Sequence, residues 1–249
     1  GDVVYVRPRV TAYNRKRLVE HKLPFVVPGN QMYLPMMGID FREHFRRLRT
    51  EAVRFGPSTQ VLILHVLLHE ARDEALTPTR MAERLGYSAM TMTRAFDELE
   101  SASLGEVLLE GRERRIRFVE SARELWARAR PFLSSPVKKR VLIGAPGIDP
   151  PGPFAGLTAL ANYSMLDAPA NPVIALSGPD WRSLKQHHLV TELPASEPQA
   201  LEIEVWSYAP GLLAAGRVVD RLSLYLSLKD NKDERVEAAL EEMMKTLPW

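Results

Sequence analysis

The period of apolar residues changes along the chain and divides it into three regions. From residue 58 to about residue 100, apolar residues recur at the three- to four-residue spacing of amphipathic helices. On either side, short β-branched runs are interleaved with helical patterns, which indicates mixed α/β units. The turn-forming residues Gly56-Pro57 and Ser134 to Pro136 lie where the pattern changes. We therefore predict three domains, at residues 1–56, 57–134 and 135–249.

The first 56 residues are predicted to form a small α/β unit. Thr11 can cap a helix that Pro24 stops, and the turn-forming residues Pro28 to Asn30 separate two apolar runs in the manner of a hairpin. Asp40 can open a further helix. The elements are expected to be a strand at 3–6, a helix at 11–22, hairpin strands at 25–27 and 32–34, and a helix at 41–53.

The last 115 residues alternate between strand and helix patterns. Leu201, Ile203 and Val205 alternate with two glutamates, which predicts a half-exposed strand. Residues 220–228 fit both periods, and the capping ability of Asp220 favours a helix there. The expected strands are 140–143, 172–176 and 201–206, and the expected helices are 156–165, 179–186 (capped by Ser177), 220–228 and 233–246.

Residues 77–100 have the pattern of two short helices joined by a tight turn. Thr77 followed by Pro78 is typical of a helix start, because proline lacks a donor that the first helical position does not need. Gly86 can take a positive φ and end this helix, and Ser88 is a good N-cap for the next one, which should reach about Glu100. The buried positions of the second helix are expected to be Met92, Ala95, Phe96 and Leu99.

Two helices around a glycine turn predict a helix-turn-helix, whose second helix enters the DNA major groove. Hydroxyls and backbone N–H groups at a helix start suit phosphate contacts. Ala89 and Met90 can touch thymine methyl groups, while Thr93 or Arg94 can reach base edges. The predicted DNA-contacting residues of this helix are Ser88, Ala89, Met90, Thr91, Thr93 and Arg94.

An arginine-rich strand–turn–strand pattern follows at residues 105–119, with Gly111 at its tip. A basic hairpin directly after a recognition helix is typical of a winged helix, where clustered guanidinium groups bind the DNA backbone or minor groove. Its predicted DNA contacts are Arg112, Arg114, Arg115 and Arg117. A closing helix is expected from Glu124 to Leu133, with Leu125, Trp126 and Ala129 inside. The predicted fold class is α+β, a central winged helix-turn-helix domain flanked by a small N-terminal α/β unit and a C-terminal mixed α/β domain.

Residues 58–133 resemble the winged helix-turn-helix of bacterial MarR-type transcriptional regulators. The resemblance is carried by Leu85 to Ser88, by Thr91 to Arg94 and by Leu99-Glu100. Ser103 stands where such regulators often have a turn glycine, and the flanking segments lack their long dimerisation helices. The resemblance implies a DNA-binding repressor. It does not imply the dimer that MarR-type regulators form or the ligand pocket between their subunits. The layout is also similar, more loosely, to antitoxins of the AbiE type, which repress their own operon and counteract a nucleotidyltransferase toxin.

Composition and charge fit this interpretation. Apolar residues make up 45% and charged residues 26% of the 249 residues, cysteine is absent, and no secretory leader pattern is present, so we expect a cytoplasmic protein without disulfides. Residues 1–56 carry a net charge of +6, residues 57–131 of −1 and residues 132–249 of −3. The basic N-terminal unit either extends the DNA footprint or binds a partner. Its candidate contacts are Arg15, Lys16, Arg17, Arg46 and Arg47.

Other candidate sites in the sequence lack the pattern that their chemistry requires. His65 and His69 have a zinc-binding spacing, but Val66 stands where a zincin needs glutamate, so partly exposed helix histidines are expected. The glycines at 144–147 and 152–156 lack the Gly-Lys-Ser/Thr of a phosphate loop and are expected to be turns. Four aromatic residues are expected in the core, namely Tyr163, Trp181, Trp206 and Tyr208. An acidic cluster is expected at a solvated helix start, formed by Asp230, Asp233, Glu234 and Glu237.

The sequence thus predicts a transcriptional regulator that binds double-stranded DNA in a sequence-specific way, without a catalytic site, metal or cofactor. A two-fold homodimer on a palindromic operator is expected. One alternative is an antitoxin that represses its own operon through the winged helix and neutralises a nucleotidyltransferase toxin through its C-terminal domain. Another is an enzyme that acts on nucleic acid and uses the winged helix for targeting.

Overall fold

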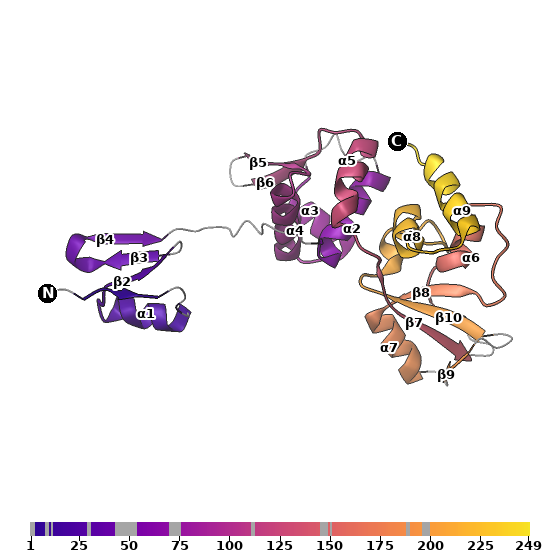
Figure 1. The fold of residues 1–249 in the computed structure, drawn as a ribbon, viewed down its shortest axis with the longest axis horizontal. Coiled ribbons are helices and arrows are strands. Elements are labelled where there is room, and N and C mark those ends of the chain that lie inside the picture. Colours follow the sequence, from indigo (N-terminus) through magenta and orange to yellow (C-terminus); the bar gives the residue numbers. More distant parts are fainter. Residues whose placement is uncertain are drawn as a thin grey trace. The chain divides into compact units, whose positions relative to one another are not determined.

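The computed structural model has a mixed α+β architecture and divides into two compact units, Gly1–Glu51 and Ala52–Trp249 (Figure 1). It describes residues 3–7, 10, 12–28, 31–42, 54–69, 76–110, 113–144, 149, 151–187, 190–195 and 200–249. Within these residues, no helix combines the length and the apolar character that crossing a bilayer requires.

The N-terminal unit is a four-stranded sheet with one helix. Strand β1 (Tyr5–Val6) precedes helix α1 (Ala12–Glu20) and pairs in parallel with β2 (Phe25–Val27). Strands β3 (Gln31–Leu34) and β4 (Ile39–Arg42) continue the sheet antiparallel, in the order β1-β2-β3-β4. The predicted hairpin of β2 and β3 is confirmed.

The prediction of a helix from Phe41 is wrong at its start, because residues 41 and 42 belong to β4. A short 3-10 turn, Pro35–Met37, reverses the chain, and Gly38 closes the turn with φ +65°. Residues 39–42 alternate apolar and polar residues, which is the period of a strand rather than a helix. They pair with β3 from Leu34↔Ile39 to Gln31↔Arg42. Residues 43–53 lie outside the described part of the chain.

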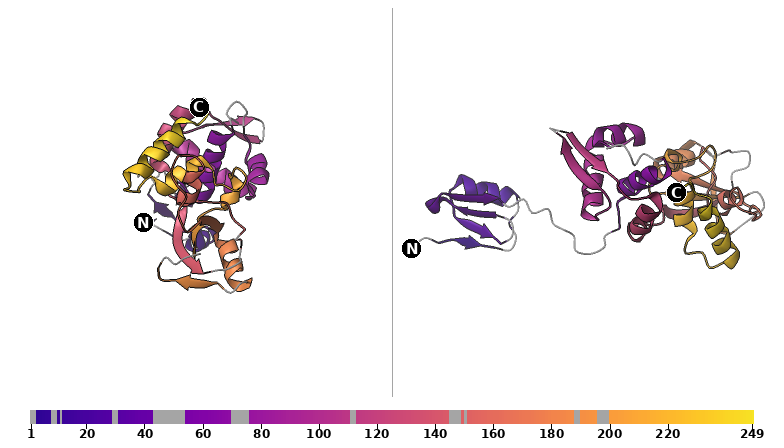
Figure 2. Two further views of the ribbon diagram at one scale, coloured as in Figure 1. Left: turned by 90° about the vertical axis from the view of Figure 1, so that its right-hand side faces the viewer. Right: turned by 90° about the horizontal axis from the view of Figure 1, so that it is seen from above.

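The second unit begins with three helices, a hairpin and a further helix, which we call the helix–hairpin module (residues 55–133). Its helices are α2 (Pro57–Leu68), α3 (Pro78–Leu85), α4 (Ala89–Ser101) and α5 (Ala122–Ala129), followed by a 3-10 turn at Arg130–Phe132. Strands β5 (Glu106–Glu110) and β6 (Glu113–Arg117) form the antiparallel hairpin. Figures 1 and 2 show this hairpin beside α3 and α4. All four expected inner residues of α4 are buried: Met92, Ala95, Phe96 and Leu99.

The C-terminal part of the second unit is a four-stranded sheet covered on both faces. Strand β10 (Ala200–Trp206) lies between β8 (Val173–Ser177), parallel to it, and β7 (Val137–Gly144), antiparallel to it, with β9 (Thr191–Leu193) at the edge beyond β7. Helix α7 (Gly178–His187) packs on one face, while α6 (Gly156–Ala161), α8 (Arg221–Leu228) and α9 (Glu234–Lys245) belong to the core on the other. The expected helices and strands of this region are confirmed, except that the helix expected at 156–165 ends at Ala161, and β9 was not predicted.

Residues 201–206 form the predicted strand, but the expectation that it is half-exposed is wrong, because both faces of β10 are covered. The side chain of Glu204 is only 1% exposed. Its carboxylate accepts hydrogen bonds from Arg140 Nε and Trp206 Nε1, both at 3.0 Å. Since a buried charge needs a paired cation and hydrogen bonds, the neighbouring strand β7 supplies what the alternating pattern alone could not reveal.

One hydrophobic core connects the helix–hairpin module with the C-terminal helices. Buried residues from α2 to α5 and from α6, α8 and α9 form a single cluster. Trp126 on α5 contacts Tyr225 edge-on and Trp249 in a stacked arrangement, with ring centroids 5.7 and 6.0 Å apart. The Gln60 side chain exchanges two hydrogen bonds with the backbone of Ser134. The predicted domain division at residue 134 stays a prediction, and the packing across it is continuous.

Candidate nucleic-acid interface

Local sequence signals fix the turn between α3 and α4. The Thr77 hydroxyl caps α3 by accepting from the backbone N–H of Arg80, at 3.3 Å. Gly86 ends α3 with φ +68°, a conformation that disfavours residues with a Cβ atom. The Ser88 hydroxyl then caps α4 by accepting from the Thr91 N–H at 3.2 Å. The predicted caps and turn are therefore confirmed.

The start of α4 is exposed and carries no acidic residue before Asp97. We call the six positions predicted to contact DNA the α4 leading edge. Ser88, Ala89, Met90 and Arg94 are exposed, and Thr91 and Thr93 are partly exposed. The Met90 side chain is 67% exposed.

Hydrogen bonds pre-order the polar groups of the α4 leading edge. The hydroxyls of Ser88 and Thr91 lie 2.8 Å apart, and Thr93 donates to the Ala89 carbonyl at 2.9 Å. Arg94 Nη2 lies 3.8 Å from the Met90 sulfur, and Arg94 makes no ion pair among the described residues. A guanidinium without a carboxylate partner at a helix surface can bind an anionic ligand without first breaking a salt bridge.

The hairpin arginines that can be described all have carboxylate partners. Arg114, whose side chain is only 18% exposed, donates to Asp97 and, at 3.0 Å, to Glu100, both on α4. Arg115 pairs with Glu113 at 2.8 Å, and Arg117 with Glu106 at 2.9 Å. Arg112 lies outside the described residues. Their role as phosphate contacts stays a prediction, and any phosphate would compete with these carboxylates.

Tight backbone geometry holds the hairpin against α4. Ser103, at the position where MarR-type regulators often have glycine, takes φ +56°, and Arg128 donates to its carbonyl oxygen. A Cβ atom on Gly105 would lie 2.7 Å from Cδ1 of Ile116 on β6, so a larger residue here would require the Ile116 side chain to move. The pairing of Asp97 on α4 with the hairpin was not predicted. The unusual serine at position 103 was the one signal of a special turn.

Most acidic side chains of the module have structural partners. The Glu98 carboxylate accepts from the Gly56 N–H at 3.2 Å. Glu124 forms a capping box with Ser121 at the start of α5, and hydrogen bonds from Ser121 lower the pKa of its carboxyl group. With Asp97 and Glu100 bound to Arg114, these acids are ion-paired or hydrogen-bonded within the module.

The two histidines of α2 do not form a described metal site. Their rings stack with centroids 4.3 Å apart, and no group of three metal-ligating side chains occurs in the described residues. The expectation that both are partly exposed is wrong for His65, which is 3% exposed because its helix is buried on all sides. Burial, followed by the nearby charges of His69 and Arg84, lowers the pKa of His65 to about 4.

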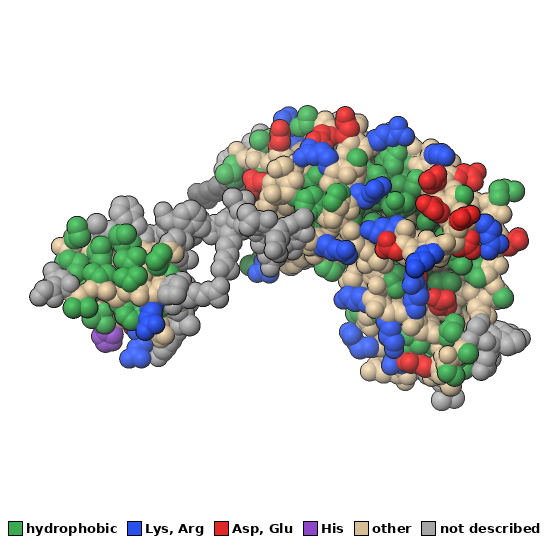
Figure 3. Space-filling view, viewed as in Figure 1, with side chains coloured by type: hydrophobic (Ala, Val, Ile, Leu, Met, Phe, Trp, Pro, Cys, Tyr) green, Lys and Arg blue, Asp and Glu red, His purple; other side chains and the backbone are tan. Residues whose placement is uncertain are grey.

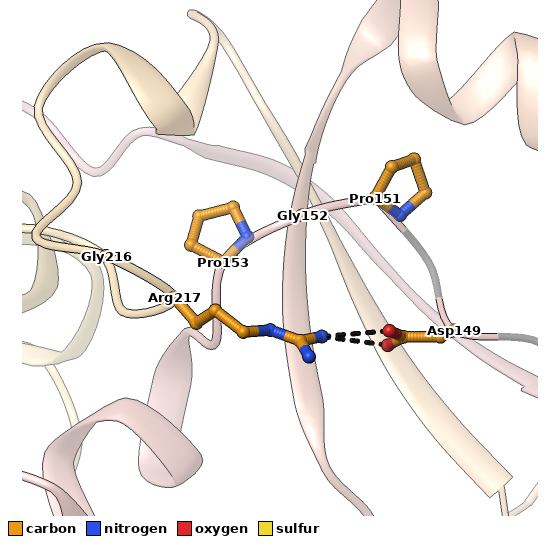
Figure 4. A pocket seen from close by; sticks show the side chains of 6 residues that line it. All are labelled: Asp149, Pro151, Gly152, Pro153, Gly216 and Arg217. Carbon is orange, nitrogen blue, oxygen red and sulfur yellow. Dashed lines mark hydrogen bonds and ion pairs between the residues drawn. The ribbon is translucent and has the colours of Figure 1, made fainter.

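A shallow hollow of about 430 Å³ lies between residues 149–153 and 216–217 (Figure 4). Its polar groups are already paired, since Arg217 donates to both oxygens of Asp149 at 2.9 and 3.2 Å. A Cβ atom on Gly152 would meet the Ala175 carbonyl oxygen at 2.2 Å, so this glycine allows close packing rather than phosphate binding. Residues 145–148 of the other glycine segment lie outside the described chain.

The remaining candidate side chains have structural roles. The aromatics Trp181, Trp206 and Tyr208 are buried, and Tyr163 is partly buried against the core, as predicted. Asp233 caps α9, and its hydrogen bond and ion pair with Arg235 lower the pKa of its carboxyl group. In the N-terminal unit, the Arg17 side chain is exposed. The side chains of Arg15, Lys16, Arg46 and Arg47 lie outside the description.

Comparisons of the chain with protein-family models, with curated proteins and with solved structures find no match. The functional assignment therefore depends on the sequence and geometry of the chain itself.

Proposed function

We propose that the helix–hairpin module is a winged helix-turn-helix and that the protein regulates transcription by binding specific double-stranded DNA. The observation that carries this proposal is the α4 leading edge. It combines exposed N-terminal hydroxyls, an exposed methionine and an arginine that makes no ion pair with any residue the structure describes, on a helix start without acids. Such a surface offers hydrogen-bond donors that can bind phosphate. It also offers an apolar side chain and a guanidinium group that can contact the edges of the bases.

In the proposed complex, α4 lies in the major groove and α3 crosses behind it. The N-terminus of α4, with Ser88 and Thr91, binds a phosphate through hydroxyls and the positive end of the helix dipole. Met90 packs on a thymine methyl group, and Arg94 donates to a base edge or an adjacent phosphate. The hairpin lies beside the helix, where the wing of a winged helix follows the DNA backbone or minor groove.

DNA selection from a random duplex pool, followed by fluorescence anisotropy on the enriched sequence, tests the proposal. The wild type should prefer the enriched duplex over a scrambled one, and affinity should fall steeply with salt. Arg94→Ala should weaken binding to the enriched duplex by about tenfold or more, as expected for a base contact of 1–3 kcal/mol. Arg182→Ala, which removes an exposed arginine from α7, is the matched control and should leave affinity unchanged.

Two results would contradict the proposal. One is equal affinity of the wild type for enriched and scrambled duplexes at every salt concentration. The other is equal weakening by the Arg94 and Arg182 substitutions, which would mean that net charge rather than the α4 leading edge governs binding.

A further inference from the structure

Strand β1 has an unpaired backbone edge within the described chain. It pairs with β2 on one side and is the first strand of the sheet order. The N–H groups of Tyr5 and Arg7 donate towards β2, at 3.0 and 3.2 Å. Because successive residues of a strand point their backbone groups to opposite sides, the N–H and C=O groups of Val4 and Val6 face away from the sheet.

Apart from the shortness of β1, which is two residues long, this edge lacks the features by which proteins usually protect exposed strands. Residues 3–6 are all apolar or aromatic, with neither proline nor a charged side chain. Val3, Tyr5 and Val6 are 82%, 45% and 58% exposed. The strand at the opposite edge, β4, carries an aspartate and an arginine in its sequence. An unprotected apolar edge is a template for pairing with another chain.

A groove accompanies the edge, because two cavities of about 370 and 530 Å³ share Tyr5, Leu18 and Leu23. The shared residues come from β1, from α1 and from the turn before β2. Leu23 is 49% exposed, so the groove opens to solvent. Figure 3 shows that apolar side chains cover much of the visible face of this unit.

The groove has a basic rim. Arg17 and His21 line one cavity and Arg7 lines the other, and none of the described residues that line them is acidic. The Arg7 guanidinium lies 5.6 Å from the centroid of the Tyr5 ring, which keeps its charge beside the strand. The groove therefore complements a negatively charged ligand that also has apolar groups.

We propose that β1 is the docking site for an extended acidic segment of a partner protein, which adds to the sheet as a further strand. The backbone groups of Val4 and Val6 hydrogen-bond the segment, and its alternate apolar side chains enter the groove. Acidic side chains between them meet Arg7 and Arg17. The proposal concerns the N-terminal unit alone and does not depend on DNA binding by the helix–hairpin module.

The full chain can be titrated against a fluorescent peptide of about eight alternating valines and glutamates, the length of a long strand. A peptide N-methylated at every second residue lacks the pairing donors, and a valine–lysine peptide reverses the charge. Val6→Pro removes only an outward-facing N–H, so β1 can still pair with β2, and Val6→Ala is its matched control. Circular dichroism and the amide NMR signals of β2 and β3 report whether the unit remains folded.

The wild type and Val6→Ala should bind the glutamate peptide, and shifts should appear at the amides of Val4 and Val6. Val6→Pro should weaken binding at least about tenfold, the loss of one good hydrogen bond, and Arg17→Gln about threefold or more. Absence of binding up to about 1 mM, or equal binding by the N-methylated peptide or by Val6→Pro, would overturn the proposal. A wild-type dimer that Val6→Pro dissociates would also overturn it, because a second copy of the chain would then occupy the edge. Displacement of the peptide by single-stranded DNA would overturn it as well.

Discussion

Two buried titratable groups should give the stability of this protein opposing dependences on pH between about 4 and 6.5, and removing either group should reveal the slope of the other. Asp220, the N-cap of α8, is buried, and its Oδ2 atom has no hydrogen-bond partner among the described residues. Burial raises its pKa from 3.8 to about 6. His65 on α2 is buried too, with a pKa lowered from 6.5 to about 4.

The two shifts act in opposite directions. The native state favours protonated Asp220, so its contribution is complete below pH 4 and is lost as pH rises to about 6. The native state favours neutral His65, so its contribution is complete above pH 6.5 and is lost as pH falls through 4. At about 1.4 kcal/mol per pKa unit, each amounts to about 3 kcal/mol. In the wild type the two slopes largely cancel.

Urea unfolding followed by tryptophan fluorescence, repeated between pH 4 and 7, measures these slopes. Asp220→Asn keeps a good N-cap but cannot ionise, so its unfolding free energy should rise by about 3 kcal/mol from pH 4 to 6.5. His65→Leu should show the opposite slope. Asp233→Asn is the control, because the lowered pKa of that exposed cap lies below this range. If Asp220→Asn and the wild type had parallel profiles, Asp220 would not be the buried acid described above.

Five further substitutions test the hairpin and its contact with α4. Arg114→Ala should weaken DNA binding about tenfold, and adding Asp97→Asn with Glu100→Gln should restore most of the affinity in the same anisotropy assay. Ser103→Gly should stabilise the protein by about 1 kcal/mol in urea unfolding, because glycine takes φ +56° without a Cβ clash. Gly105→Ala should destabilise it by about 1–3 kcal/mol, because the new methyl group overlaps the neighbouring strand. A stability loss in the serine variant, or none in the alanine variant, would contradict the geometry of this turn.

Elements with local signals could be predicted from the sequence. The caps at Thr77, Ser88 and Asp220 and the turn at Gly86 each depend on one side chain and its own backbone neighbours. The buried face of α4 followed from helical spacing for the same reason. Such signals lie within a few residues of one another, so a single sequence contains all the information that they need.

Predictions failed where the outcome depends on distant partners. The helix expected from Phe41 was overridden by pairing with β3, and Glu204 is buried because Arg140, 64 residues away, lies on the adjacent strand. The bond between Arg114 and Asp97 spans 17 residues and two elements. A row of arginines in sequence looks like a basic surface, and only the fold reveals that the described ones have acidic partners.

These pairings change how a module with a net charge of −1 can bind a polyanion. If Arg114 contacted phosphate directly, removing Asp97 and Glu100 would restore to the Arg114→Ala variant only as much affinity as it adds to the wild type, through the general effect of two fewer negative charges. If instead it neutralises these two carboxylates behind the α4 leading edge, its loss leaves two negative charges beside the proposed DNA path, and removing them restores binding. The small exposed fraction of the Arg114 side chain, 18%, and its two carboxylate partners favour the second account. In that case the hairpin positions the recognition helix and shields the DNA from its acids, and Arg94 with the N-terminus of α4 supplies the direct contacts.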